Sequence, residues 1–194
     1  KKAVFLYGPP GIGKTITVEA LANDYRMEFV EKNASDYRTE NAVNRFAGLA
    51  SQYSSLFGEK RIILLDELDG LTGTADKGGV KATTEIVKNA QCPIVLIANS
   101  AYDPRFSNLR NYCLLIEFKK PPAGEVTKHL KRICGLEEIR ADEDALKFIA
   151  KRSEGDVRSA VNDLQALAQG KKKLTYEDVS WLGYRERQDT SFNV

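Results

Sequence analysis

The stretch that most constrains the fold of this chain is GPPGIGKT, at residues 8–15, which directly follows a short apolar run. That run, Ala3–Tyr7, is bounded by glycine and proline, which is typical of a buried parallel strand. From Lys14 onward the apolar residues recur at spacings of three and four, which predicts a helix. The sequence therefore predicts a strand, a glycine-rich loop and a helix in direct succession, with backbone N–H groups turned toward one anion.

The loop matches the pattern G-x-x-x-x-G-K-T, in which the lysine reaches the outer phosphates of a nucleotide and the threonine hydroxyl ligates Mg²⁺. A glycine-rich turn with an incidental lysine is the alternative, which the strand and helix on either side disfavour. We predict a nucleoside triphosphate site whose loop residues are Gly8, Pro9, Pro10, Gly11, Ile12, Gly13, Lys14 and Thr15.

Composition limits the class of protein. The 194 residues suffice for one domain of ordinary size or two small ones, and 42% of them are hydrophobic, which is enough for a core. The formal net charge of +2 is too close to zero to indicate nucleic-acid binding by itself. Cys92, Cys113 and Cys134 are odd in number and widely separated, which is typical of buried thiols and not of a disulfide framework.

Neither a signal peptide nor an apolar run near the roughly 20 residues of a membrane span is visible, so we expect a soluble intracellular protein. Both ends of the chain look cut. The first strand begins at Ala3, which leaves no room for the segment that usually covers a nucleotide base, and residues 187–194 carry no cap or turn. We therefore expect a fragment of a longer polypeptide.

Predicted strands and helices alternate over the first part of the chain, and several of the strands are apolar throughout. This pattern predicts an α/β fold with a parallel sheet covered by helices on both faces. After the first strand and helix, we predict strands at residues 27–33, 61–70, 93–100 and 113–118, a turn followed by a helix at 34–53, and a helix that begins after Gly79.

The composition changes at residues 119–124, where two lysines, two prolines and a glycine end the strand pattern. Only helical periodicity follows, so we predict a boundary near Lys120 between a nucleotide-binding domain at 1–120 and a small helical domain at 121–194. The predicted helices of this second part are residues 126–134, 145–152, 157–168 and 176–182.

Polar side chains at the ends of two predicted strands supply the rest of the site. Asp66 and Glu67 follow four apolar residues, at the carboxyl end of a strand, where α/β sheets place ligands. Asp66 can hold Mg²⁺ directly or through water, and Glu67 can orient and deprotonate an attacking water. An acidic strand end that only solvates the turn is the alternative. Asn99 ends another strand and can hydrogen-bond both a γ-phosphate and that water, or can simply form a turn.

One cation in the second part lies at an unfavourable position. Gly155 and Asp156 predict a helix start, which puts Arg158 in the first turn, where the helix dipole disfavours a positive charge. Contact with a phosphate would account for this placement. A solvated surface arginine is the alternative.

These motifs, and the helical lid that follows the α/β core, resemble those of the AAA+ ATPases. Along the chain the motifs come in the order GPPGIGKT, IILLDE, IAN and GDVR. The longer stretches NASDYRT, LFGEKRIILLDELDGL, DPRFSNLRNYCLLIEFKKP and GDVRSAVNDLQAL resemble the clamp-loader branch of that family, and within it the archaeal large-subunit type. The resemblance covers nearly the whole chain.

The resemblance implies a sheet of order 5-1-4-3-2 followed by a helical lid, with ATP and Mg²⁺ bound. Lys14 and Thr15 would hold phosphate and Mg²⁺, Asp66 would hold Mg²⁺, and Glu67 would act on water. Asn99 would be the residue called sensor 1. Arg158 would be the sensor 2 arginine of the lid. The implied catalytic residues are therefore Glu67, Asn99 and Arg158.

The resemblance further implies an ATPase subunit that opens a sliding clamp of the PCNA type and places it on primer–template DNA. It would act in a hetero-oligomer with clamp-loader small subunits, without a membrane, in the nucleoid region of archaeal cytoplasm or in a eukaryotic nucleus. A collar domain would follow Val194. Full hydrolysis would need the neighbouring subunits.

One departure bears on the kind of subunit. Small clamp-loader subunits carry Ser-Arg-Cys where this chain has residues 111–113, so the arginine that would reach a neighbour's ATP is absent from its usual place. We do not expect Arg110 to substitute for it. This departure favours a large subunit and predicts slow hydrolysis by the isolated chain, because an arginine supplied in trans accelerates such reactions by orders of magnitude.

Contact with DNA rests on a basic set at elements that face the central channel in this family. Such residues would grip phosphates without reading sequence, and a solvated helix face is the alternative for each of them. The set is Arg38, Lys77, Lys81 and Lys88. For Tyr25, Tyr37 and Tyr53 we expect packing in or near the core instead of stacking on bases.

Two other functions fit parts of the pattern. Another AAA+ ATPase that acts on DNA, of the helicase or initiator type, would need a wedge hairpin or a winged helix, and the sequence suggests neither. A nucleotide-binding scaffold without hydrolysis would not need the carboxylate of Glu67.

Overall fold

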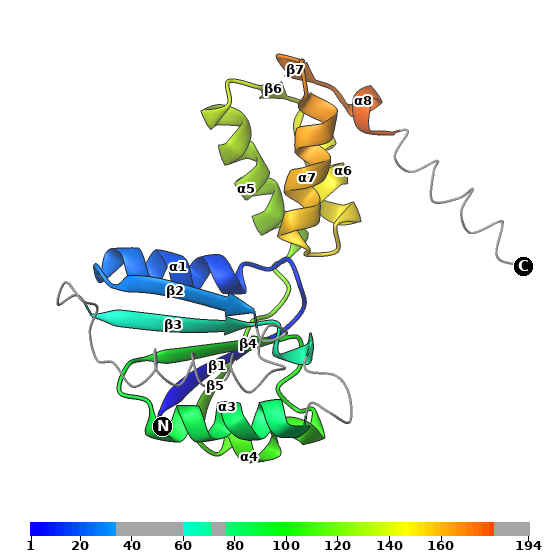
Figure 1. Cartoon of the computed structure of the whole chain (residues 1–194). Helices are drawn as coiled ribbons and strands as arrows, with labels where there is room; N and C mark the ends of the chain where they lie inside the picture. The colour runs from blue at the N-terminus through cyan, green and yellow to red at the C-terminus, as the bar shows by residue number, and fades with distance from the viewer. Residues whose placement is uncertain (34–59, 71–76, 181–194) are drawn as a thin grey trace, which may run out of the picture. The chain divides into compact units, whose positions relative to one another are not determined.

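The computed structural model describes residues 1–33, 60–70 and 77–180, and its first part is a five-stranded parallel sheet (Figure 1). The strands lie in the order β2-β3-β4-β1-β5, which confirms the predicted order and the α/β class. The predicted helix at residues 34–53, with Arg38, Tyr37 and Tyr53, lies outside the described residues. The strand bounds are β1 Ala3–Tyr7, β2 Glu28–Asn33, β3 Arg61–Asp66, β4 Ile94–Ala98 and β5 Cys113–Glu117.

Helices cover both faces of this sheet (Figure 1). On one face, α1 packs Val18 and Ala22 against a cluster that includes Leu64. On the other face, α3 and the loop before β5 pack around Leu96 and the fully buried Phe106. The helices of this part are α1 Lys14–Asp24, α3 Lys77–Asn89, α4 Ser107–Arg110 and the 3-10 helices η2 Leu68–Gly70 and η4 Pro104–Phe106.

The central strands β3 and β4 are apolar because they have helices on both sides. Along β4 all five residues are buried, and neighbouring side chains alternate between the two core clusters. The polar ends of these strands, at Asp66 and Asn99, leave the core at the same edge of the sheet. This edge is where the predicted site residues converge.

The helix α3 begins at Lys77, before the predicted start after Gly79. Glycine lowers helix stability by about 1 kcal/mol relative to alanine, and a buried amphipathic face offsets that cost. Here Ile86 and Val87 supply the buried face, and the Thr83 hydroxyl donates to the Gly79 carbonyl at 2.9 Å.

The second part of the chain is mainly helical, around a core centred on Leu130, Ile149 and Leu164. The prediction of helices alone was wrong, because β6 (Arg140–Ala141) and β7 (Lys173–Leu174) form a two-stranded parallel sheet. Strands of two residues are too short to show an alternating pattern. The helices are α5 Ala123–Leu136, α6 Glu143–Arg152, α7 Val157–Ala168 and α8 Tyr176–Ser180.

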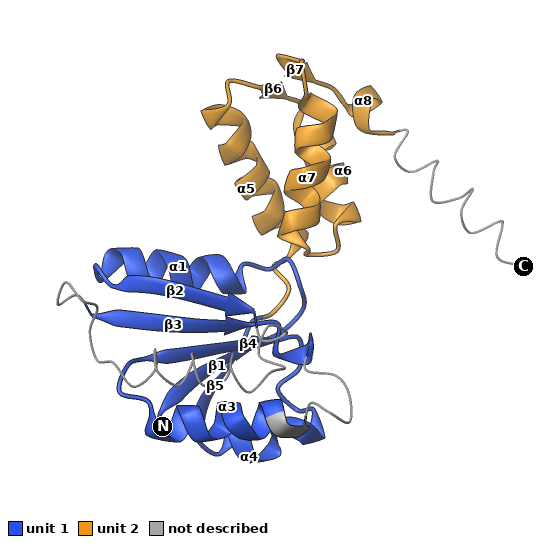
Figure 2. Cartoon of the chain, viewed as in Figure 1, with its two compact units in different colours: residues 1–118 blue, residues 119–194 orange. Residues whose placement is uncertain are grey.

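The chain divides into two compact units, Lys1–Phe118 and Lys119–Val194 (Figure 2). The three cysteines are free and buried as predicted, and burial raises the pKa of each thiol, that of Cys113 to about 11. Among the described residues, none of the helices has the length and apolar character that a bilayer crossing requires.

Candidate nucleotide-binding site

The loop between β1 and α1 has a backbone that only glycine adopts easily. Gly8, Gly11 and Gly13 have φ angles of 142°, 69° and 96°. At Gly8 an added Cβ would lie 2.1 Å from the carbonyl oxygen of Phe118, so the loop and the end of β5 are in direct contact there. Gly13 is the N-cap of α1, whose first backbone N–H groups therefore point toward the loop. Pro10 lies at the exposed tip of this loop, between the half-buried Pro9 and Ile12.

Lys14 lies under this loop and is 7% exposed. Its ammonium donates hydrogen bonds to the carbonyl oxygens of Gly8 at 2.8 Å and Pro9 at 2.7 Å. These bonds fix one full positive charge next to the N-terminus of α1. Both the ammonium and the helix N-terminus favour an anion at the loop.

The structure brings Thr15 and Asp66 together, although they are 51 positions apart in the sequence. The Thr15 hydroxyl donates to Asp66 Oδ2 at 2.6 Å. The other carboxylate oxygen, Oδ1, accepts a hydrogen bond from the backbone N–H of Glu67 at 2.7 Å. Hydroxyl and carboxylate oxygens are the hard ligands that Mg²⁺ prefers, so this pair fits the predicted ion.

A second carboxylate lies near Asp66. On β2, the pKa of Glu31 is raised, first by partial burial and then by the charges of Asp66 and Glu19. In the described ranges no three His, Cys, Asp or Glu side chains cluster as a protein-only metal site. A cation at Thr15 and Asp66 would therefore take further ligands from phosphate and water, as Mg²⁺ commonly does.

Glu67 has an unusual backbone and a specific partner. Its φ of 55° is left-handed, which is uncommon for a residue with a side chain and is frequent at functional sites. Its carboxylate Oε2 accepts a hydrogen bond from the Asn33 side-chain amide at 2.6 Å. The sequence interpretation missed Asn33. It is the polar residue that ends β2, in register with Asp66, so the rule that selected Asn99 also selects Asn33.

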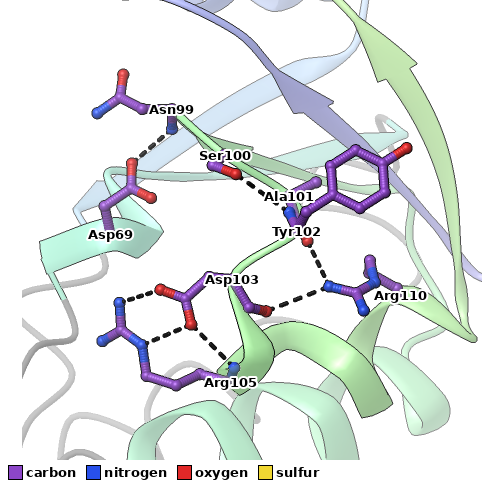
Figure 3. Close-up of polar contacts among 8 residues, drawn as sticks. All are labelled: Asp69, Asn99, Ser100, Ala101, Tyr102, Asp103, Arg105 and Arg110. Atoms are coloured by element: carbon purple, nitrogen blue, oxygen red, sulfur yellow. Dashed lines mark hydrogen bonds and ion pairs between the residues drawn. The ribbon is translucent and has the colours of Figure 1, made fainter.

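Asn99 follows β4, and its backbone is held on both sides. Its N–H donates to Asp69 Oδ2 at 2.5 Å, and its carbonyl oxygen accepts from the Gly8 N–H at 3.2 Å. Figure 3 shows its side chain extending away from Asp69 and from the loop that follows. Asn99 is exposed where β4 ends, and its backbone is bonded to the first glycine of the loop.

Arg110 is engaged within its own chain. Its Nη1 donates to the carbonyl oxygens of Ala101 at 2.8 Å and Asp103 at 3.2 Å (Figure 3). Its guanidinium carbon lies 5.6 Å from the centre of the Tyr102 ring. These contacts support the expectation that Arg110 does not act on a neighbour's nucleotide.

Arg158 lies in the second unit, in the first turn of α7. The predicted cap is present, since the Asp156 carboxylate accepts from the Ser159 N–H at 2.8 Å. The placement of the second unit relative to the first is not determined, so contact between Arg158 and a nucleotide stays a prediction.

The residues predicted to contact DNA have different surroundings. Lys81 is exposed on α3. Lys88 pairs with Glu85 at 2.7 Å and lies 5.0 Å from the centre of the Tyr112 ring, and the Glu85 hydrogen bond raises its pKa. Lys77 begins α3, and its side chain is outside the description, as is all of Arg38.

The prediction of packing was wrong for Tyr25, which is 71% exposed. Tyr25 is the C-cap of α1, one residue past the last helical position. The helix buries Val18 and Ala22, and Tyr25 lies beyond that buried face.

Comparison with known families identifies two domains in the chain. Residues 4–110 match the AAA family, described as the ATPase family associated with various cellular activities. Residues 128–169 match a family described as the RCF1/5-like AAA+ ATPase lid domain. The chain belongs to the AAA family of ATPases, as its motifs predicted.

The chain is also similar to curated proteins named replication factor C large subunit. It is 47% identical over 195 residues to that of Staphylothermus marinus, across 100% of this chain and 46% of the relative. It is 47% identical over 182 residues to that of Methanosarcina acetivorans, across 94% of this chain and 30% of the relative. The chain thus spans less than half the length of these relatives. The predicted resemblance to the large-subunit type of clamp loader is confirmed.

Solved structures support the fold. The Thermotoga maritima RuvB Holliday junction branch migration motor matches with a TM-score of 0.71 and 19% identity, over 91% of this chain and 59% of that one. A point variant of the same RuvB matches with a TM-score of 0.69 and 19% identity, over 91% of this chain and 59% of the other. At this identity the likeness concerns the fold alone.

Proposed function

We propose that this chain binds and hydrolyses ATP as part of the large subunit of a sliding-clamp loader. The observation that carries the proposal is the Thr15–Asp66 hydrogen bond of 2.6 Å, directly beside Glu67 and behind the loop that encloses Lys14. This bond joins the phosphate-binding loop to the acidic end of β3. Phosphate, metal and water groups are thereby gathered at one edge of the sheet.

Nucleotide binding falls to the loop and to α1. The backbone N–H groups of residues 8–15 and the ammonium of Lys14 would hold the phosphates. Thr15 and Asp66 would hold Mg²⁺, which when bound neutralises charge on the phosphate oxygens. The residue pair fits this role through its oxygen chemistry.

Hydrolysis falls to the strand ends. We assign Glu67 as the base that takes a proton from the attacking water, and Asn99 as the amide that holds water and γ-phosphate. The Asn33 amide restrains the Glu67 carboxylate from the β2 side. Restraint of the base by a neighbouring strand allows hydrolysis to depend on the state of the assembly.

We infer the partners from the similarity to replication factor C large subunits and from the absence of an arginine at residues 111–113. We propose a nucleotide-binding domain at 1–120 and a lid at 121–194, with Arg158 reaching the nucleotide from the lid. Clamp-loader small subunits would supply an arginine in trans, and a PCNA-type clamp and primer–template DNA would be the substrates of the assembly. Of the predicted DNA contacts we retain Lys81, whose side chain is exposed on α3 and would be free to meet a phosphate.

The test is steady-state ATP hydrolysis by the full-length protein with its small subunits, with and without sliding clamp and primed DNA. We expect stimulation that requires both clamp and DNA, and that falls when this chain carries Glu67→Gln. Stimulation unchanged by Glu67→Gln would make the chain a nucleotide-holding scaffold. Hydrolysis indifferent to clamp and DNA would favour another DNA-acting AAA+ ATPase.

A further inference from the structure

We propose that Asp69 is a positioning residue for hydrolysis, because it grips the backbone of Asn99 and so fixes where the Asn99 amide points. The proposal rests on the function proposed above for Glu67 and Asn99. Asp69 itself does not contact the nucleotide in this proposal. It acts through the loop that begins at Asn99.

The contact is short and has a charged acceptor. Asp69 Oδ2 accepts the backbone N–H of Asn99 at 2.5 Å (Figure 3). Hydrogen bonds from backbone N–H groups to carboxylates are shorter and about twice as strong as those between neutral groups. This bond therefore holds Asn99 more firmly than a neutral loop contact would.

The backbone carbonyl of Asn99 is also hydrogen-bonded. The Asn99 carbonyl oxygen accepts from the N–H of Gly8, the first glycine of the phosphate loop, at 3.2 Å. With N–H and C=O both bound, the direction of the Cα–Cβ bond at Asn99 is set. The backbone of Asn99 thus joins the 3-10 helix η2 to the phosphate-binding loop.

The carboxylate that accepts this bond lies in a hydrogen-bonded turn. Asp69 is part of η2, and the preceding residue Glu67 has a left-handed φ of 55°. The backbone carbonyl oxygen of Glu67 accepts from the Gly70 N–H at 2.8 Å. Leu68, between the two acids, is 0% exposed and fixes the turn in the core. Glu67 and Asp69 therefore belong to one turn that Leu68 anchors in the core, so the base and Asn99 have a common support.

The rest of the loop has its own supports. Arg110 binds the carbonyl oxygens of Ala101 and Asp103, and the Tyr102 ring packs edge-on against Tyr7 at 5.6 Å between centroids. The Asp103 carboxylate caps η4 through the Arg105 N–H at 2.9 Å. Loss of Asp69 should consequently disturb Asn99 and leave residues 101–106 in place.

Two substitutions at Asp69 separate the loss of the hydrogen-bond acceptor from the loss of side-chain volume. Asp69→Ala removes the acceptor, whereas Asp69→Asn keeps an oxygen that can accept the same N–H. Asp103→Ala is the matched control, because it removes a carboxylate cap from the same loop without touching Asn99. Thermal unfolding of all three variants measures any general loss of stability.

Amide hydrogen exchange on the chain tests the contact itself. We expect exchange at Asn99 to be at least about tenfold faster in Asp69→Ala, faster by a smaller factor in Asp69→Asn, whose amide oxygen is a neutral acceptor, and close to the natural rate in Asp103→Ala. Unchanged exchange at Asn99 in Asp69→Ala would overturn the proposal. This measurement needs no hydrolysis, so it decides on the contact even if the proposed function fails.

Hydrolysis by the full-length protein with small subunits, clamp and primed DNA tests the consequence. We expect Asp69→Ala to lower kcat about tenfold with little change in ATP affinity, Asp69→Asn to lower it by a smaller factor, and Asp103→Ala to leave it unchanged. The double variant with Asn99→Ala should be no slower than Asn99→Ala alone. Independent, multiplying losses in the double variant would overturn the proposal. A natural protein that hydrolyses no ATP would instead contradict the proposed function.

Discussion

At the scale of single residues, the site depends on polar groups that bind one another across neighbouring strands. Asn33 on β2 holds Glu67, which follows β3, and Asp69 holds Asn99, which follows β4. Each contact ties a group proposed for hydrolysis to a residue that does not itself perform chemistry. The geometry of the reacting groups thus depends on their neighbours.

The Asn33 contact gives a prediction about restraint. β2 lies on the side of β3 opposite to β4 and β1, and the phosphate loop follows β1, so the bond draws the Glu67 carboxylate away from the nucleotide. Asn33→Ala should therefore raise ATP hydrolysis in the absence of clamp and DNA, by about threefold to tenfold. The measurement is steady-state hydrolysis by the assembled protein, and Asn33→Asp, which also removes the donor, should act in the same direction.

Asn108→Ala serves as a control at an exposed asparagine of α4 in the same unit. A fall in unstimulated hydrolysis for Asn33→Ala, with Asn108→Ala unchanged, would show that Asn33 holds Glu67 in its working position instead.

Some of these site residues could be predicted from the sequence and others could not. Lys14, Thr15, Asp66 and Glu67 were predicted because their spacing and their place at strand ends are local signals. Asn33 also ends a strand, so the same local rule applies to it, whereas Asp69 carries no local signal of this kind. The partners of both residues depend on strand order and on hydrogen bonds between elements 30 or more positions apart, which a linear pattern does not encode.

At the scale of elements, the glycine loop is shaped by contact with the strand that ends beside it. The end of β5 approaches Gly8 so closely that a Cβ would meet the Phe118 carbonyl oxygen at 2.1 Å, and the Phe118 N–H donates to the Tyr7 carbonyl at 2.7 Å. The neighbour is backbone, which cannot rotate aside.

Gly8→Ala should consequently destabilise the first unit by several kcal/mol, roughly 2–4, through steric overlap and a φ of 142°. Gly135→Ala in α5 is the matched control, because no heavy atom lies within 4 Å of its added Cβ, and it should stabilise by about 0.5–1 kcal/mol. Denaturant unfolding measures both. Equal stability of the two variants would show that the loop and β5 separate without cost.

The helix α8 depends on a carboxylate whose charge is favoured in the folded chain. Hydrogen bonds from Lys171, and then from the N–H and hydroxyl of Thr175, hold the pKa of Asp178 at about 2, below its usual value of 3.8. A lowered pKa means that the unfolded chain binds the proton more tightly. The stabilising contribution is therefore present above about pH 4 and is lost as the pH falls toward 2.

We expect Asp178→Asn to be less stable than the natural chain at neutral pH, and the difference to disappear as the pH falls below about 2, because the two differ chiefly while Asp178 is charged. Thermal unfolding across this pH range measures the difference. A difference that persists at the acid end would mean that the carboxylate acts through packing and not through its charge.

At the scale of the whole molecule, the alternation of apolar strands and amphipathic helices was enough to predict the sheet and its helical companion. The strands β3 and β4 are long, apolar and flanked by turn residues, so their pattern is strong. The pair β6–β7 was missed, since its partners lie at Arg140 and Lys173 and it contributes only two residues from each side. Pairing at that separation depends on how α6 and α7 pack, which the sequence pattern leaves open.

Arg158 is the residue of the second unit for which we propose a contact with the nucleotide. Arg158 lies in the first turn of α7, where the helix dipole disfavours a cation, and Asp156 provides the cap independently of it. Arg158→Ala should thus leave the second unit as stable as before, or more stable by about 0.3–1 kcal/mol. If Arg158 reaches the nucleotide, the same variant should weaken ATP binding by the full-length protein by about tenfold or more.

Equilibrium binding of ATP, measured beside thermal unfolding, separates these outcomes. Arg132→Ala is the control, because Arg132 is an exposed arginine of α5 in the same unit and should change neither quantity. Unchanged ATP affinity in Arg158→Ala would make this residue a solvated surface arginine. Weaker binding with undiminished stability would mean that an unfavourable position within the helix is retained for a phosphate in the other unit, so that closing of the lid and holding of ATP are one event.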